Sequence, residues 1–113
     1  MEGLKDYREI TRRAICSMND CQPSNIPAEY ETLFLCDLDS GQFQLMNLGW
    51  QGKKRICSIT LLARIKNDKI WIEEDWTEDG LASRLVALGV PQDDIVLAFH
   101  PPHIRPMTDF AVA

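Results

Sequence analysis

Carboxylates gather in one short stretch of the chain, and they are the first side chains that could do chemistry. Five of the seven residues from 73 to 79 are acidic: Glu73, Glu74, Asp75, Glu78 and Asp79. Carboxylates at a strand end could bind Mg²⁺ or act as a general acid and base. A nuclease of the restriction-endonuclease type would add a Glu-x-Lys motif, which the sequence lacks. We therefore favour a solvated corner that leads into a helix over a catalytic cluster.

Histidine and cysteine are the other residue types that could bind a metal. His100 and His103 are separated by two prolines, which keep the backbone extended, and no Cys or carboxylate within five residues completes a tetrahedral site. Cys16 and Cys21 lie close in sequence but have no histidine nearby. We expect loop or interface histidines and free thiols, with no metal and no cofactor.

One basic stretch, residues 47–55 (NLGWQGKKR), is flanked by an aromatic residue. Its glycine and lysines could hold a phosphate while Trp50 stacks on a base, so direct nucleic-acid binding through Trp50, Lys53, Lys54 and Arg55 is one hypothesis. A hairpin tip that carries lysines is also an ordinary way to keep a protein soluble. We favour this second interpretation.

Composition and charge restrict the class of protein. A chain of 113 residues with 45% hydrophobic residues is expected to fold as one globular domain, residues 1–113. The net charge of −5 argues against independent DNA binding, which depends on Lys and Arg neutralising phosphates. The sequence has no stretch apolar enough to span a membrane and no signal peptide, so we expect a cytoplasmic protein.

The apolar periodicity predicts an α+β fold. It indicates a helix over residues 4–18, strands over 30–37, 43–50, 55–65 and from 70, a second helix over about 78–88, and a last strand over 95–99. Thr77 is expected to cap the second helix, and Gly89 to end it before Pro91. We predict an antiparallel meander sheet of about four to five strands with both helices on one face.

The three tryptophans have no obvious place in the core. If Ile70 and Ile72 point inward, alternation directs Trp71 to the opposite face of the sheet. We predict that Trp76 folds back over the sheet as a lid. For Trp50 and Trp71 we predict an exposed patch on the helix-free face, framed by Arg55 and Arg64, that binds a partner or a second copy.

These segments together resemble the XisI family, the fdxN-element excision controlling factors of bacteria. The resemblance rests on residues 47–55, 69–72, 75, 77–78, 80, 89–91, 94–101, 105, 108 and 110–113. Two positions depart from the family pattern. Trp76 replaces a small turn residue, and Leu62-Ala63 stand where many relatives carry a histidine.

The resemblance implies a non-catalytic factor for programmed DNA excision that acts through an XisH-like partner and a site-specific recombinase. Contact with DNA would be indirect, no membrane would be involved, and a homo-oligomer stays open. The matching positions Asp75, Thr77, Glu78, His100 and Arg105 form a candidate functional corner. Two alternatives remain: a regulator or inhibitor of an XisH-like nuclease outside excision, and a metal-dependent hydrolase using Glu74, Asp75, Glu78 or His100.

Overall fold

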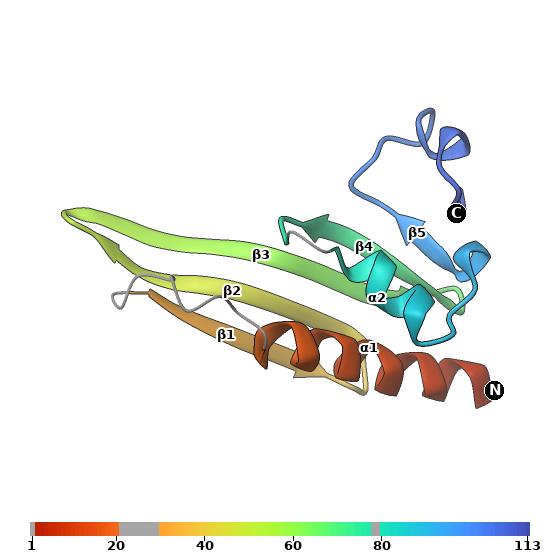
Figure 1. The fold of residues 1–113 in the computed structure, drawn as a ribbon, viewed down its shortest axis with the longest axis horizontal. Helices are drawn as coiled ribbons and strands as arrows, with labels where there is room; N and C mark the ends of the chain where they lie inside the picture. Colours follow the sequence, from red (N-terminus) through yellow and green to blue (C-terminus); the bar gives the residue numbers. More distant parts are fainter. Residues whose placement is uncertain (1, 21–29, 78–79) are drawn as a thin grey trace.

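The computed structural model describes residues 2–20, 30–77 and 80–113, which form two α-helices, a five-stranded sheet and two short 3₁₀ turns (Figure 1). In chain order the elements are α1 (Glu2–Asp20), β1 (Tyr30–Asp37), β2 (Gln42–Gln51), β3 (Lys54–Lys66), β4 (Lys69–Asp75), α2 (Leu81–Ala87), η1 (Gln92–Asp94), β5 (Ile95–Leu97) and η2 (Arg105–Met107). The predicted α+β class is therefore confirmed.

The five strands lie in the sheet in the order in which they occur in the chain. The first three pairs are antiparallel, but β4 and β5 are parallel. The expectation of a purely antiparallel meander is wrong for this last pair. The reason is α2, which carries the chain back to the end of the sheet where β4 began, so β5 runs in the same direction as β4.

Both helices cover one face of the sheet, as predicted, and the core lies between them. Each strand contributes alternate residues to that face, and each helix contributes an apolar stripe. The core cluster includes Ala14, Ile15, Phe43, Leu45, Leu61, Ala63, Ile70, Ile72, Leu81 and Leu85, none more than 2% exposed. The alternation seen in residues 70–72 is thus confirmed, since both isoleucines point inward.

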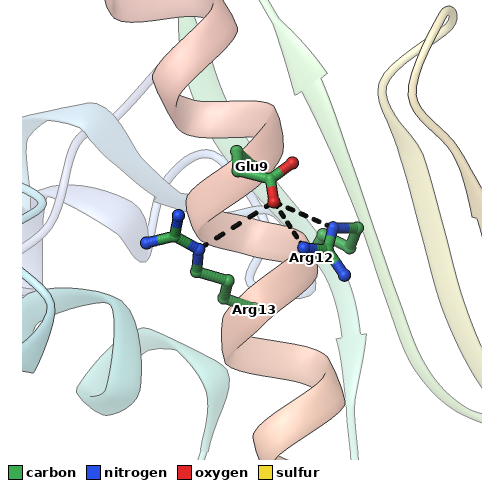
Figure 2. A network of polar contacts seen from close by, with 3 residues as sticks. All are labelled: Glu9, Arg12 and Arg13. Carbon is green, nitrogen blue, oxygen red and sulfur yellow. Dashed lines mark hydrogen bonds and ion pairs between the residues drawn. The ribbon is translucent and has the colours of Figure 1, made fainter.

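The outer side of α1 carries an ion-pair network. The Glu9 carboxylate accepts from Arg12 and lies 3.9 Å from Nε of Arg13, one turn along the helix (Figure 2). The hydrogen bond from Arg12 holds the pKa of Glu9 below its usual value. All three groups face water, and such pairs contribute little to stability. The network supports the helix but does not decide the fold.

Asp75, and not Thr77, caps the start of α2. The Oδ2 atom of Asp75 accepts the backbone N–H of Leu81 at 2.6 Å, and its Oδ1 atom accepts the N–H of Thr77 at 3.0 Å and the Thr77 hydroxyl. Thr77 instead accepts the N–H of Gly80, which precedes the helix, at 3.2 Å. The prediction that Thr77 caps the helix is therefore wrong. The helix also begins later than the predicted residue 78, at Leu81, and Glu78 and Asp79 lie outside the described residues.

The end of α2 follows the expected pattern. Gly89 adopts φ of 101°, and its N–H donates to the carbonyl of Val86 at 3.0 Å. The N–H of Val90 donates to the carbonyl of Leu85, also at 3.0 Å. This pair of bonds is a Schellman motif, and the two buried side chains of Leu85 and Val90 complete it.

Tyr7 ties α1 to the β5 side of the sheet. Its hydroxyl donates to the Asp94 carboxylate. Burial, the hydrogen bond and the negative charge of Asp94 together raise the pKa of Tyr7 to about 12 from a reference value of 10.0. Because the folded pKa is the higher one, the stability that this phenol contributes is present below about pH 10. It is lost as the pH rises through about 12.

We therefore expect Tyr7→Phe to lower the free energy of unfolding by about 1 kcal/mol at neutral pH. The difference between the two proteins should shrink as the pH rises from about 10 to about 12, because the wild-type phenol then ionises. Urea unfolding at a series of pH values measures this difference. A gap that stays constant up to the highest pH would show that the Tyr7 phenol does not titrate as the structure requires.

Candidate functional site

The face of the sheet turned away from the helices carries an apolar band over β1, β2 and β3. Leu45 is buried on the core side, so its neighbour Met46 points to the other face. A bulge at Leu45/Met46 pairs Met46 with Ile59 on β3, while β1 pairs Leu33 with Met46. The same alternation adds further residues, and we call the whole set the far-face patch: Leu33, Leu35, Met46, Leu48, Ile59 and Leu62.

The far-face patch is only partly shielded. Leu35 is 44% exposed and Ile59 36%, and the other members are half-buried. Neither helix lies over this face, because both pack on the core side. This patch was not predicted from the sequence, although a signal was present. Along β2, polar or small residues replace apolar ones on the core side after Leu45, while Met46, Leu48 and Trp50 are apolar on the other side.

The tip of the β2–β3 hairpin combines an exposed aromatic ring with three cations. Trp50 is 51% exposed, and the guanidinium of Arg55 lies 5.1 Å from its ring centroid. Lys53 and Lys54 are exposed at the turn between the strands. The tip projects well beyond both helices along the long axis of the molecule (Figure 1). These four residues, which were predicted to act together, are thus close to one another in the structure.

Arg64 and Trp71 lie elsewhere, as a pair across β3 and β4. Arg64 donates from Nε to Glu73 at 2.7 Å. Trp71 lies on the face opposite the core, as predicted, but it is only 8% exposed. The expectation that Trp71 and Trp50 form one exposed patch is therefore wrong. Arg55 and Arg64 accordingly do not lie on either side of a single patch, as was also expected.

The C-terminal tail, residues 98–113, accounts for the burial of Trp71. Ala111 forms a parallel bridge with Val96, whose other side pairs with Trp71. The Arg105 guanidinium lies 5.6 Å from the Trp71 ring centroid, and Lys66 Nζ lies 4.6 Å from it. The indole N–H donates to the carbonyl of Lys66 at 3.0 Å. The tail is folded onto this part of the sheet and is not a free loop.

Arg105 holds the tail in this position. Its guanidinium donates to the backbone carbonyls of His100 at 3.0 Å and of Ala98 and Val112, each at 3.4 Å. His100 packs its ring against Phe99, with centroids 4.6 Å apart. In the described part of the chain, no hydrogen bond or ion pair joins Arg105 or His100 to Asp75 or Thr77. The proposed functional corner therefore separates into a helix cap and a tail anchor, and its Glu78 is not described.

Trp76 does not fold back over the sheet. Its backbone N–H donates to the carbonyl of Thr60 at 2.8 Å, which extends the pairing of β4 with β3. Its side chain is 76% exposed, so the prediction of a lid is wrong. Asp75 fixes the corner directly before it, and the backbone held in this way leaves the ring in solvent.

The residue types considered for metal binding do not converge in the structure. Among residues 2–20, 30–77 and 80–113, no group of three or more His, Cys, Asp or Glu side chains is placed to hold a metal ion. Both carboxylate oxygens of Asp75 already accept hydrogen bonds from the start of α2. Within the same described ranges, no helix is long and apolar enough to cross a membrane.

Comparisons with known proteins agree with this architecture. The model of the XisI protein family matches residues 1–112. A XisI-like protein from Anabaena variabilis ATCC 29413 is 33% identical, with a TM-score of 0.83 over 97% of this chain and 99% of that one. The fdxN element excision controlling factor XisI from the same organism is 37% identical, with a TM-score of 0.87 over 98% and 99%. No curated protein gives a significant match.

The family match covers nearly the whole chain, and two crystal structures from the family share its fold over almost their full length. The chain therefore belongs to the XisI family.

Proposed function

We propose that this protein is a non-catalytic controlling factor of DNA-element excision that acts by binding an XisH-like protein. The family match supports this, as does a relative that is itself described as an fdxN element excision controlling factor. A site-specific recombinase would perform the DNA chemistry, and this chain would contact DNA only through its partners.

The observation that carries the proposal is the hairpin tip. Trp50 lies half-exposed beneath the Arg55 guanidinium, at a position that the core does not use. Tryptophan and arginine are the residue types that dominate binding energy in protein interfaces. Lys53 and Lys54 would guide the tip toward acidic groups on the partner. We assign Trp50, Lys53, Lys54 and Arg55 to partner binding, with Arg64 at the margin and Trp71 as support beneath the tail.

The alternative in which the chain regulates an XisH-like nuclease outside excision uses the same surface. The two functions differ in what the bound partner does and not in how it is bound. An excision assay on a plasmid that carries the element separates them.

Co-purification with an XisH-like protein tests the proposal. We expect the two chains to elute together from a size-exclusion column at micromolar concentration. Trp50→Ala should weaken the complex by about 2 kcal/mol, or roughly thirtyfold in Kd measured by calorimetry. The reason is that the variant loses an indole ring that would be buried against the partner in the complex. Trp76→Ala is the matched control, since it removes a tryptophan that is also exposed, outside the tip.

Separate elution of two folded proteins would overturn the proposal, and so would an equal loss of affinity in both variants. Labelled duplex DNA mixed with this chain alone at low salt provides the remaining comparison. Binding that weakens steeply with added salt would favour direct nucleic-acid recognition by the tip instead.

A further inference from the structure

The far-face patch is an apolar surface that neither described helix covers. Its six residues lie on the side of the sheet without helices, while the C-terminal tail covers only the part around Trp71 and β5. Sheets that expose such a face in a monomer usually meet another layer, because a contiguous apolar surface in water is costly. The charges around the patch indicate what that layer is.

Charge is unevenly distributed between the β2–β3 hairpin and the strands beside it. Residues 40–67, which include both strands and their turn, contain five of the twelve Lys and Arg residues and none of the 17 Asp and Glu residues. Three of the five cations, Lys53, Lys54 and Arg55, lie at the tip. Two carboxylates flank the other end of the patch, where a bulge places Glu73 and Glu74 beside Leu62. Glu73 is already paired with Arg64 at 2.7 Å, and Glu74 is the second carboxylate there.

This distribution is complementary to itself. A second copy can be placed face to face with the first by a twofold rotation. The axis would lie between the two sheets, perpendicular to the strands, and pass near the Leu48–Cys57 pair. Trp50 of each copy would then pack on Met46 of the other. The lysines of each tip would lie over the acidic end of the other copy, since both are several residues from the axis.

We propose that the far-face patch binds a second copy of this chain, forming a twofold dimer with the two sheets face to face. Two sheets packed in this way have the geometry of an ordinary β-sandwich, with about 10 Å between them. The interface is isologous, so each copy contributes one basic tip and one acidic end. The dimer places Trp50 and the tip lysines against the second copy, so it competes for the same residues with the partner binding proposed above. The tests below use the purified chain alone, so their failure is distinguishable from failure of the proposed function.

Analytical ultracentrifugation of the purified chain is the first test. We expect a monomer–dimer equilibrium that weakens with added salt, because the contacts at both ends of the interface are ionic. Ile59→Lys should raise the dimer dissociation constant at least about tenfold, since it places a charge in the centre of the patch. Val86→Lys is the matched control, because Val86 is 38% exposed on α2 and Ile59 is 36% exposed on the far face.

Charge reversal identifies the partner as a second copy. The double variant Lys53→Glu/Lys54→Glu has an acidic tip as well as an acidic opposite end. The double variant Glu73→Lys/Glu74→Lys has a basic tip and a basic opposite end. Each variant alone should be monomeric through like-charge repulsion, whereas an equimolar mixture should form heterodimers. Lys53 and Lys54 are exposed, whereas Glu73 and Glu74 are half-buried and Glu73 is paired with Arg64, so circular dichroism must verify that each variant is folded.

Cys57 provides an independent readout, because it is exposed on β3 beside the expected axis. A short bis-maleimide should link two wild-type chains, and Cys57→Ser should abolish the link while leaving Cys16, Cys21 and Cys36 in place.

Three results would overturn the proposal. The first is a wild-type chain that stays monomeric at high micromolar concentration, in which case the patch serves a different protein. The second is a dimer that Ile59→Lys and Val86→Lys weaken equally. The third is a mixture of the two charge-reversed variants that fails to associate.

Discussion

Trp71→Ala should lower the free energy of unfolding by about 3–5 kcal/mol, the usual cost of removing a large buried aromatic side chain. The ring is 8% exposed and lies between the sheet and the C-terminal tail. Its removal leaves a cavity, frees the carbonyl of Lys66 from its indole donor, and takes away the surface on which Arg105 lies. Urea denaturation followed by circular dichroism measures the change.

Trp50→Ala and Trp76→Ala are the controls for this measurement. Both rings are more than half exposed, at 51% and 76%, so their loss should change stability by less than about 0.5 kcal/mol. In Trp71→Ala, hydrogen exchange should also become faster at the N–H of Ala111, which donates to the carbonyl of Ile95. Unchanged stability of Trp71→Ala would show that the tail does not pack on this ring in solution.

Asp75→Ala should lower the free energy of unfolding by about 2–4 kcal/mol. One carboxylate accepts the N–H groups of Thr77 and Leu81 and the Thr77 hydroxyl, and each such bond to a charged acceptor is worth about 1 kcal/mol or more. The variant leaves the first N–H of α2 without its acceptor. Leu81 and Leu85, fully buried on α2, depend on that helix being in place.

Thermal unfolding of Asp75→Ala beside Asp93→Ala checks the role of this carboxylate. Asp93 is an exposed aspartate in η1, so its loss removes the same charge without removing a described hydrogen bond. Thr77→Ala should fall between the two, because it removes one hydroxyl from the same corner. Equal effects of Asp75→Ala and Asp93→Ala would indicate that net charge, and not the helix cap, decides the stability at this position.

Local patterns were sufficient to predict most of the fold. Alternation placed Ile70 and Ile72 in the core and Trp71 on the opposite face, and the glycine before Val90 marked the end of α2. The two-residue turn between β3 and β4 also has a local cause, since Asn67 and Asp68 tolerate the positive φ of 53° and 63° that it requires. All of these features depend on residues that are near one another in the chain.

The errors concern contacts between distant segments. The burial of Trp71 depends on Arg105 and Ala111, whose positions cannot be derived from the strand that carries the ring. The direction of β5 depends on the path of α2 across the sheet. On β3, Ile59 and Leu62 share the far face only because the register with β2 shifts at a bulge, and a strand pattern read with strict period two does not reveal that shift. For the candidate site, the tip residues were grouped correctly, but the second tryptophan was not.

The parallel pairing of β5 also has a consequence for how the chain folds as it is made. The first four strands are joined by consecutive hairpins, so they can pair as soon as each leaves the ribosome. The last strand must wait for α2, and the tail that shields Trp71 is synthesised after both. A nascent chain would therefore display the indole of Trp71 to solvent until residues 98–113 have been synthesised. During that interval, a chaperone that recognises exposed aromatic groups has a binding site that the finished protein no longer offers.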